Sequence, residues 1–342
     1  PSDEVSKEDL FEIRVIIGYF VQSILENIIT SYLQEIHDVD IIVSGGIFYN
    51  IKLNIMILNK MYKVVENNKF KYKFCVTPLA GDQGAALGVY EKFNKNLKYS
   101  HLNWGKRIFN MDYIEKELKD IHNKDKYSAN GIFKNSVKVF VDKNKFIEAI
   151  YNSLLKDEIV NIVHGNMEFG PRALCNTSTL ALPTKENVQF INTINERNTV
   201  MPMAPVLLEE NLLNLFSPIQ YERVIGSDRF MILTYDYIDS AITKDDFFKK
   251  YSGIMHKYPL QYKFSGRPQV LKKDDSESVI SNVLKLIQSK TKALINTSFN
   301  FHGKPIIFSV EQAFDDFKLE IEHAIKNNLD YSRIKLYIYL GN

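Results

Sequence analysis

Two apolar strands, each leading into a glycine turn and a helix, constrain the fold of this chain most strongly. The first unit is VDIIVSGGIFYN, residues 39–50, which runs into the helical period of residues 51–65. The second is FKYKFCVTPLAGDQGAALGVYEKF, residues 70–93, which repeats the order of strand, loop and helix. Units of this kind predict an α/β fold. Two of them in close succession indicate one face of a nucleotide site.

Two domains are expected, because 342 residues exceed the ~250 to 300 at which single cores usually stop growing. Residues 95–134 are polar and rich in Asn and Lys, which predicts a connector containing a short helix. We expect one domain over residues 1–125 and a second over 126–342. In the second, helices are predicted over residues 143–157 and 278–291 and a terminal helix from near Val310, whereas residues 206–260 should alternate strands and loops.

The segment of residues 9–36 has apolar side chains at helical spacing over a wide arc, which predicts a long and largely buried helix. No apolar run reaches the ~18 to 20 residues of a membrane span. The first ten residues also lack the basic flank and apolar run of a signal peptide. We therefore expect a cytoplasmic protein without a membrane partner.

Charge and cysteine content exclude some function classes. Lys and Arg number 43 against 41 Asp and Glu, so the net charge of +2 gives no basic field that would indicate nucleic-acid binding. Small-molecule partners are favoured. The two cysteines, Cys75 and Cys175, suit a reducing compartment better than a disulfide scaffold, and neither has a Cys or His neighbour at metal spacing.

The two glycine turns are candidate ligand sites. Gly45 and Gly46 stand where a strand turns into a helix, so their backbone N–H groups could face an anion, or they could form a plain tight turn. Asp82 lies between Gly81 and Gly84 at the next helix start. Its carboxylate could hold a divalent ion or a ribose hydroxyl, or it could simply cap the helix.

In the second half of the chain, three arginines are the main indication of a ligand site. Arg172, Arg197 and Arg267 each stand beside Pro, Gly or small polar residues rather than on a solvated helix face. Guanidinium groups suit phosphate and carboxylate oxygens, so three converging arginines would form an oxyanion pocket. Three unrelated structural ion pairs are the alternative. Short polar side chains after the apolar run ALI would line a pocket or form a simple turn; they are Asn296, Thr297, Ser298 and Asn300.

Several of these stretches resemble one enzyme family. GNMEFGPRALCNTSTLALP, INTINERNTVMPMAPVLLEE, SGRPQV and ALINTSFNFHGKPIIFSVEQAFDDF look like the C-terminal domain of the O-carbamoyltransferases, which act on nodulation factors, cephalosporins and aminoglycosides. VSGGIFYNIKLN and PLAGDQGAALGVY resemble the end of the preceding domain in the same enzymes. The motifs follow the family order and cover nearly the whole chain.

The resemblance implies the end of a sugar-kinase/actin-like domain followed by an α/β domain like threonylcarbamoyl-adenylate synthase. It also implies an activity in which carbamoyl phosphate and ATP form carbamoyl-adenylate. The carbamoyl group would then pass to an acceptor hydroxyl on a sugar, an antibiotic or a hydroxymethylated nucleobase. ATP with Mg(II), and a divalent metal expected to be Fe(II), are the implied cofactors. A homodimer is possible.

Carried over by position, the resemblance assigns roles to specific residues. Arg172, Arg197 and Ser298 would be catalytic, and Asp82 would bind the metal. The carbamoyl phosphate and adenylate site would comprise Glu168, Arg172, Arg197, Arg267, Asn296, Thr297, Ser298 and Asn300. The nucleotide would contact Gly45, Gly46, Asn50, Gly81, Gln83 and Gly84.

This chain departs from the family pattern in three places. Cys175-Asn176-Thr177-Ser178 stands where the family has Gly-Asn-Arg-Ser. Asn195 and Met201 replace a family Lys and Arg, which removes two positive charges from the phosphate pocket. The first half of the first domain, with the family's paired metal-binding histidines, has no counterpart, so we expect the full site only with that portion present. A non-catalytic nucleotide-binding module, or a partner subunit of a split enzyme, is the alternative function.

Overall fold

The computed structural model describes residues 7–33, 35–36, 39–68, 73–93, 101–107, 109–122, 135–197, 203–217, 227–257 and 264–341. Its N-terminal part contains the helix α1 (Lys7–Leu33), the strand β1 (Ile41–Val43), the 3-10 turn η1 (Gly46–Tyr49), and then α2 (Ile51–Asn68), β2 (Phe74–Val76) and α3 (Asp82–Phe93). The strands β1 and β2 pair in parallel, with Ile41 opposite Phe74 and Val43 opposite Val76. Both expected strand–turn–helix units are therefore present.

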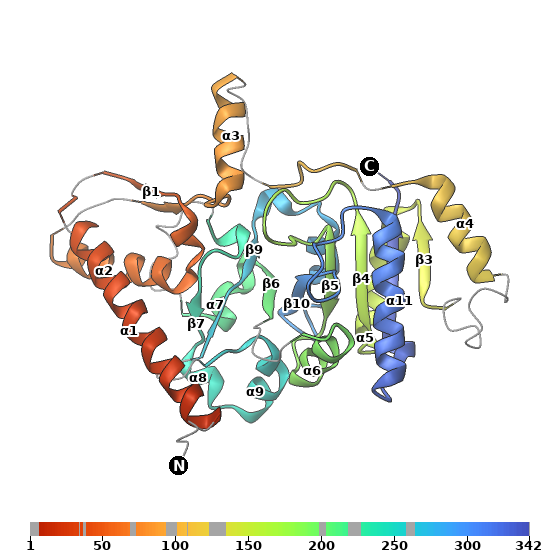
Figure 1. Cartoon of the computed structure of the whole chain (residues 1–342). Helices are drawn as coiled ribbons and strands as arrows, with labels where there is room; N and C mark the ends of the chain where they lie inside the picture. The colour runs from red at the N-terminus through yellow and green to blue at the C-terminus, as the bar shows by residue number, and fades with distance from the viewer. Residues whose placement is uncertain are drawn as a thin grey trace, which may run out of the picture.

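The second part is built on a mixed seven-stranded sheet in the order β3-β11-β4-β5-β10-β6-β9 (Figure 1). β3, β11 and β4 are parallel, β5 and β10 run antiparallel to their neighbours, and β6 pairs in parallel with β9. The strands are β3 (Val137–Phe140), β4 (Ile159–His164), β5 (Thr177–Ala181), β6 (Ala204–Leu208), β9 (Gln269–Leu271), β10 (Ala293–Ser298) and β11 (Ile334–Tyr339).

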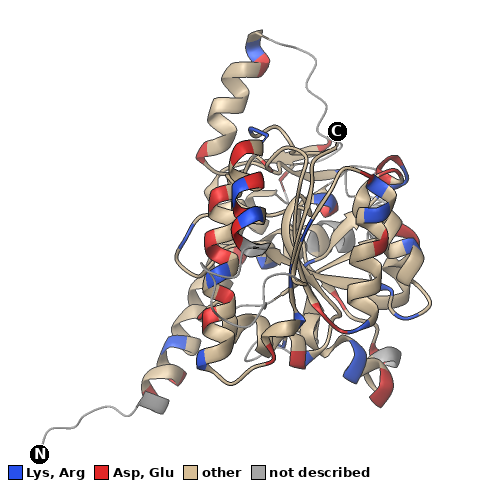
Figure 2. Ribbon diagram, turned by 90° about the vertical axis from the view of Figure 1, so that its right-hand side faces the viewer, with Lys and Arg blue, Asp and Glu red and all other residues tan. Residues whose placement is uncertain are grey.

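Helices cover both faces of this sheet, which Figure 2 shows edge-on between them. The helices α5 (Lys143–Leu155) and α10 (Val279–Ile287) pack on one face, and α6 (Lys185–Ile194) and α11 (Val310–Lys326) on the other. The alternation of β4 explains both cores: Val160 and Ile162 face the first pair, whereas Ile159 and Val163 face the second. The expected α/β class is confirmed.

Side-chain caps fix where these four helices begin. Asp142, Thr184, Ser278 and Ser309 each accept a hydrogen bond from a backbone N–H of the first turn. Lys and Arg are mixed with Asp and Glu along the helices on both sides of the sheet (Figure 2).

Two sequence-based expectations about the second part were wrong. The helix from Val310 is not terminal, because β11 follows it and inserts between β3 and β4. The segment of residues 206–260 forms mainly short helical turns: η2 (Glu209–Asn211), α7 (Leu212–Leu215), η4 (Ser227–Phe230), α8 (Asp239–Ile242), α9 (Asp245–Tyr251) and η5 (Ser252–Ile254). Most of its described aromatics pack in the core. The short strand β7 (Tyr235–Asp236) pairs with β8 (Ser265–Gly266), which lies just beyond this segment.

The expected connector contains the helix α4 (Met111–His122), and its described residues pack on the second part. The N–H of Gly105 donates to the carbonyl of Met167 at 2.9 Å, and Lys318 on α11 lies 3.2 Å from Glu117 on α4. The division at residues 125 and 126 stays a prediction. The turns η6 (Lys273–Asp275) and η7 (Tyr331–Arg333) complete the described elements.

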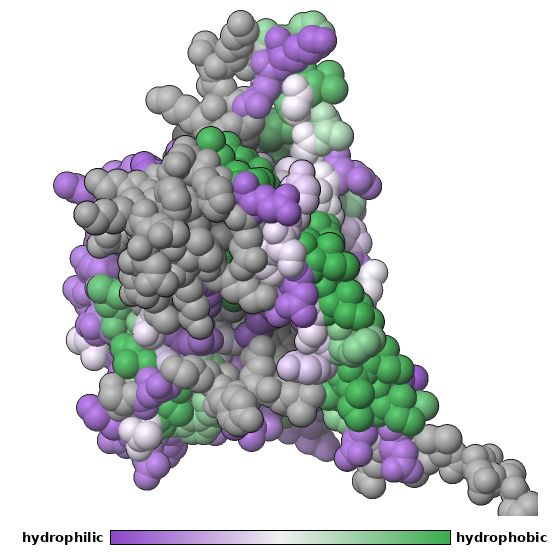
Figure 3. Space-filling model, turned by 90° about the vertical axis from the view of Figure 1, so that its left-hand side faces the viewer, coloured by the Kyte–Doolittle hydropathy of each residue, from purple (hydrophilic) through white to green (hydrophobic). Residues whose placement is uncertain are grey.

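The helix α1 departs from expectation because most of its apolar side chains are exposed. Ile16, Phe20 and Ile28 are each more than half exposed, and Figure 3 shows hydrophobic side chains gathered along this helix. Leu25 and Ile29 do pack against the core. Among the described residues, α1 is the one helix whose length and mean hydropathy of 1.3 could allow it to cross a membrane, contrary to the expectation that no segment would. Length and composition alone are weak evidence for a span.

Substitutions should separate the exposed face of α1 from the core. Phe20 is 64% exposed, so Phe20→Ser should change the free energy of unfolding by less than about 0.5 kcal/mol. Ile57 on α2 is 0% exposed, so Ile57→Ala should lower it by roughly 2 to 5 kcal/mol. Denaturant unfolding of the two variants beside the parent chain measures both. An equal loss of unfolding free energy in the two variants would contradict the exposure of the apolar face of α1.

Candidate functional site

The loop between β4 and β5 folds around one buried carboxylate. The Oε1 atom of Glu168 accepts hydrogen bonds from the backbone N–H groups of Leu174 at 2.6 Å, Asn176 at 2.7 Å and Thr177 at 3.2 Å. Its Oε2 atom accepts from the Thr177 hydroxyl at 2.6 Å. Glu168 was expected to contact the substrate, but these bonds engage both of its oxygens inside the loop. These bonds shape the turn that carries Arg172, and a contact of Glu168 with the substrate stays a prediction.

The structure brings the three candidate arginines to one cavity of about 170 Å³. Arg172 comes from the β4–β5 loop, Arg197 follows α6, and Arg267 lies between β8 and β9. The antiparallel pairing of β10 with β5 brings the end of β10 alongside the arginine loop. Seven of the eight expected substrate residues line this cavity: Arg172, Arg197, Arg267, Asn296, Thr297, Ser298 and Asn300.

Arg197 is held by the chain that leaves β10. Its Nη1 donates to the Thr297 hydroxyl at 2.7 Å, and its Nη2 donates to the carbonyl oxygens of Ser298 at 2.8 Å and Asn300 at 3.1 Å. Its own position follows from the end of α6, where Glu196 takes a positive φ of 51° and the Arg197 N–H bonds back to the Asn192 carbonyl at 2.8 Å. Arg197 therefore clamps the β10 exit against the end of α6.

Two buried polar atoms beside this cavity have no hydrogen-bond partner in the described part of the chain. They are the Nε of Arg172, a donor, and the Oδ1 of Asn296, an acceptor. Burial also lowers the pKa of the Arg172 guanidinium, with Tyr49 partly offsetting this. Since nearly all buried polar groups in proteins are paired, a donor and an acceptor left open together indicate a ligand or an ordered water.

A second cavity, of about 230 Å³, adjoins the first through Arg172, Arg267 and Met203. The N-terminal part contributes Tyr49 and Lys52, which sequence reasoning missed. Lys52 reaches across to the Ser265 hydroxyl at 2.6 Å. The position of Lys52 at the start of α2, directly after the first glycine turn, was the sequence feature that could have indicated its place in the site. Among the described residues that line this cavity, none is Asp or Glu.

The histidines near the motifs make local contacts. Burial lowers the pKa of His256 in the second cavity, while its bond to the Met203 carbonyl opposes this and the nearby Arg267 and Lys52 add to it. Burial also lowers the pKa of His164 to about 4, and its Nε2 lies 2.8 Å from the Cys175 carbonyl. A neutral His164 is therefore a hydrogen-bonded structural group. His302, in contrast, lines the first cavity.

The two glycine loops meet at the carboxyl ends of β1 and β2. The Gly45 N–H donates to the Ala80 carbonyl at 2.8 Å, and the Tyr49 hydroxyl donates to Gln83 Oε1 at 3.1 Å. Gly45 has a φ of 116°, which favours glycine, and a Cβ at Gly84 would lie 2.2 Å from the Leu79 carbonyl oxygen. These two glycines are therefore required by the backbone whatever they bind.

The remaining expected nucleotide residues differ in their surroundings. Asn50 Oδ1 accepts from the Leu53 N–H at 3.0 Å, so this side chain caps α2. A Cβ at Gly46 would meet nothing within 4 Å, whereas one at Gly81 would lie 2.7 Å from the Tyr49 ring. Their contact with a nucleotide stays a prediction.

Asp82 does not make a metal site with other described residues. It is an exposed side chain in the first turn of α3, and the described part of the chain contains no cluster of three or more His, Cys, Asp or Glu that could hold an ion. Iron and other transition metals need several such ligands. The described residues therefore do not fit the expected metal.

A buried acid, Glu320, bonds to Asn195, one of the two positions where the family has a cation. Glu320 accepts hydrogen bonds from Asn195 Nδ2 at 3.0 Å and from Asn161 Nδ2 at 2.5 Å. Burial raises the pKa of Glu320 to about 7, against the lowering effect of these two amides and of Arg197. Asn195 thus serves a buried network rather than supplying a charge. Met201, the other departure, lies outside the described residues.

Glu320 predicts a pH dependence of stability. Its folded-state pKa of about 7 lies above the ordinary value of about 4.3 for a free Glu, so the folded state holds an extra proton between these values. Glu320 therefore stabilises the folded state fully at pH values below its unfolded-state pKa. This stabilisation, up to roughly 3 kcal/mol, is lost as the pH rises through the folded-state pKa of about 7. Unfolding free energies at pH 5 and pH 8 should differ less in Glu320→Gln than in the parent chain. An identical pH profile for both proteins would contradict the assignment.

The chain matches a family model and is similar to several curated proteins. The family model described as carbamoyltransferase C-terminus matches residues 151–331. An uncharacterized protein of Methanocaldococcus jannaschii is 31% identical over 339 residues, covering 95% of this chain and 58% of that protein. Nodulation protein NolO of Bradyrhizobium diazoefficiens is 25% identical over 294 residues, covering 80% of this chain and 45% of NolO. A solved structure of Sua5 from P. abyssi is 13% identical, with a TM-score of 0.37, over 59% of this chain and 48% of Sua5.

The chain spans about half the length of the curated relatives it matches. The family match covers more than half of the chain, and it contains the β4–β5 loop, the end of α6 and the exit of β10 that form the first cavity. The chain therefore belongs to the carbamoyltransferase C-terminus family.

Proposed function

We propose that this chain is the carbamoyl-activating part of an ATP-dependent O-carbamoyltransferase and that its first cavity binds carbamoyl phosphate. The observation that carries the proposal is the meeting of Arg172, Arg197 and Arg267 with the open acceptor of Asn296 in one cavity. Guanidinium groups neutralise a phosphate, whereas an amide oxygen suits an N–H donor. Carbamoyl phosphate carries both chemical features.

ATP fits the second cavity in this proposal. Lys52, Arg172 and Arg267 surround it, so a triphosphate would meet positive charge on several sides. Lys52 would then supply, from the N-terminal part, charge that the family places at the positions of Asn195 and Met201. Mg(II) would enter with the nucleotide as the counter-ion of its phosphates.

The chemistry balances in three steps. Water first cleaves carbamoyl phosphate into carbamate and phosphate. A carbamate oxygen then attacks the α-phosphorus of ATP and displaces pyrophosphate, which leaves carbamoyl-adenylate. An acceptor hydroxyl finally displaces AMP; a sugar, an antibiotic or a hydroxymethylated nucleobase would each supply it. Arg172 and Arg267 would hold the phosphate groups in place during the first two steps.

The final transfer would need a second polypeptide segment in this proposal. The relatives are about twice as long as this chain, and α1 presents an apolar face near the glycine loops. A segment like the preceding half of those relatives would cover that face and complete the transfer site. Hydrogen exchange of α1, measured with and without the N-terminal half of the M. jannaschii relative, tests this. Slower exchange in the mixture supports it, and unchanged exchange contradicts it.

Arg172 gives the sharpest test of the activity. Incubation of the chain with carbamoyl phosphate, ATP and Mg(II) should release pyrophosphate, and Arg172→Ala should slow that release by about 100-fold or more. Arg172→Lys keeps the charge but loses the planar fork, so an intermediate rate is expected. The matched control is Arg14→Ala on exposed α1, which should leave the rate unchanged.

The same assay separates the enzyme from a non-catalytic module. Arg197 is engaged with protein acceptors and Asn195 carries no charge, and these two features favour the module as the second candidate. Calorimetry that shows tight ATP binding, together with no pyrophosphate release even when the preceding half is added, would establish the module. Release that is unaffected by Arg172→Ala would remove Arg172 from the site.

A further inference from the structure

The amide of Asn296 lies at the floor of the first cavity in a single defined orientation. Its side chain is 1% exposed. Its Nδ2 donates to Gln269 Oε1 at 2.6 Å and to the Ala173 carbonyl at 3.2 Å. Because both amide protons are engaged, Oδ1 is the polar atom of this side chain that is left without a hydrogen-bond partner.

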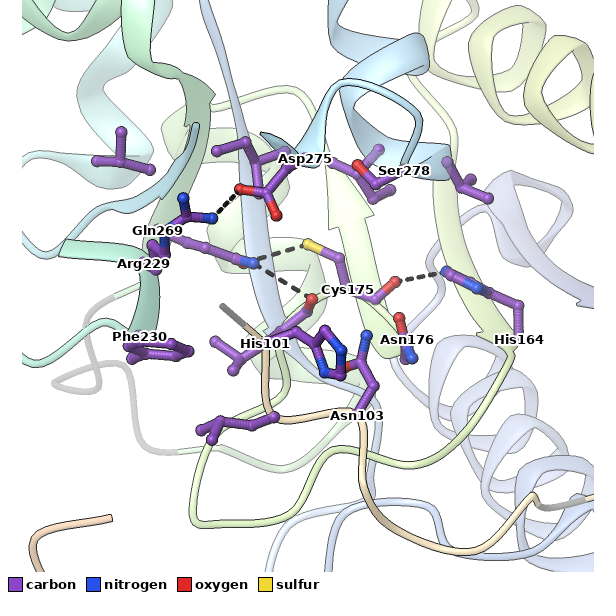
Figure 4. A pocket seen from close by; sticks show the side chains of 16 residues that line it. His101, Asn103, His164, Cys175, Asn176, Arg229, Phe230, Gln269, Asp275 and Ser278 are labelled. Atoms are coloured by element: carbon purple, nitrogen blue, oxygen red, sulfur yellow. Dashed lines mark hydrogen bonds and ion pairs between the residues drawn. The ribbon is translucent and has the colours of Figure 1, made fainter. Parts of the chain in front are cut away.

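Gln269, which sequence reasoning did not assign to the site, is oriented by the same loop. Its Nε2 donates to the Leu174 carbonyl at 3.2 Å, and its Oε1 also accepts from the Cys175 thiol at 3.3 Å (Figure 4). Burial raises the pKa of Cys175 well above its usual value, so this thiol keeps its proton and donates. A rotated Gln269 amide would place its oxygen against the Leu174 carbonyl.

The two neighbouring carbonyls of Ala173 and Leu174 therefore fix both amides. Turning Asn296 over would place its oxygen against the Ala173 carbonyl and against Gln269 Oε1. The surrounding contacts thus hold Oδ1 as an acceptor in a cavity otherwise rich in donors. A phosphate oxygen placed there would meet a lone pair, whereas an N–H group would form a hydrogen bond.

We propose that Asn296, held by Gln269, is the specificity-determining residue that selects a carbamoyl phosphate over other acyl phosphates. This rests on the proposed function of the first cavity. Asn296 Oδ1 accepts a hydrogen bond from the carbamoyl amino group while the arginines hold the phosphate. A methyl group in the same place, as in acetyl phosphate, leaves Oδ1 buried without a partner. Gln269 acts through Asn296 and is a positioning residue.

Calorimetry on the full chain with freshly dissolved carbamoyl phosphate, acetyl phosphate and inorganic phosphate tests this. The parent chain should bind carbamoyl phosphate at least about tenfold more tightly than acetyl phosphate. Asn296→Leu removes the acceptor at similar volume. It should bring that ratio to about one while the affinity for inorganic phosphate changes less than about threefold.

Gln269→Met tests the positioning role, because it frees the Asn296 amide to rotate while leaving Asn296 in place. The ratio of the affinity for carbamoyl phosphate to that for acetyl phosphate should fall by about threefold or more. Gln288→Met is the matched control on the exposed end of α10 and should keep the parent ratio. A loss of general stability alone would weaken all three ligands together, whereas the positioning role changes their ratio.

Each outcome is decisive. Equal affinity of the parent chain for the two acyl phosphates, or an unchanged ratio in Asn296→Leu, would overturn the selection by Asn296 while leaving phosphate binding intact. Binding of none of the three ligands would overturn the proposed function of the cavity as well. If either variant fails to fold, the ratio in the parent chain and the remaining variant still decide.

Discussion

The geometry of the candidate site depends on the buried carboxylate of Glu168. By accepting the N–H groups of Leu174, Asn176 and Thr177, it closes the β4–β5 loop into a rigid turn. That turn directs the Ala173 and Leu174 carbonyls toward two side-chain amides, and it carries Arg172 to the first cavity. Removing these acceptors would leave buried donors without partners, which is costly in a water-poor interior.

The cations around the two cavities divide into clamps and candidate ligand groups. Arg197 ties the end of α6 to the exit of β10, so its charge is already engaged with protein oxygens. Arg172 retains an open Nε, and Lys52 crosses from the N-terminal part into the same region. Lys52 lines the second cavity, which shares Arg172, Arg267 and Met203 with the first, so tertiary structure brings a cation from a distant segment to this region.

Exposed apolar surface on α1 stands beside an otherwise well-packed core. The same wide apolar arc that predicted burial is present, but α2 covers only one side of it. Apolar patches of this kind commonly mark an interaction surface. The polypeptide segment proposed to complete the transfer site would pack against this uncovered face.

The sequence alone determined the local elements, because periodicity, glycine turns and helix caps are properties of short segments. It indicated the α/β class, both strand–turn–helix units and the residues that meet in the first cavity. It misread the burial of α1 and missed β11, since neither burial nor strand insertion is a local property. Only the tertiary structure decided that Glu168 supports the loop, that Arg197 is a clamp, and that Gln269 and Lys52 adjoin the site. The partners of Glu168 lie only 6 to 9 residues away, but their closure around it depends on how the whole loop folds. The roles of Arg197, Gln269 and Lys52 depend on partners from 27 to 213 residues away in the chain, whose distances no local pattern encodes.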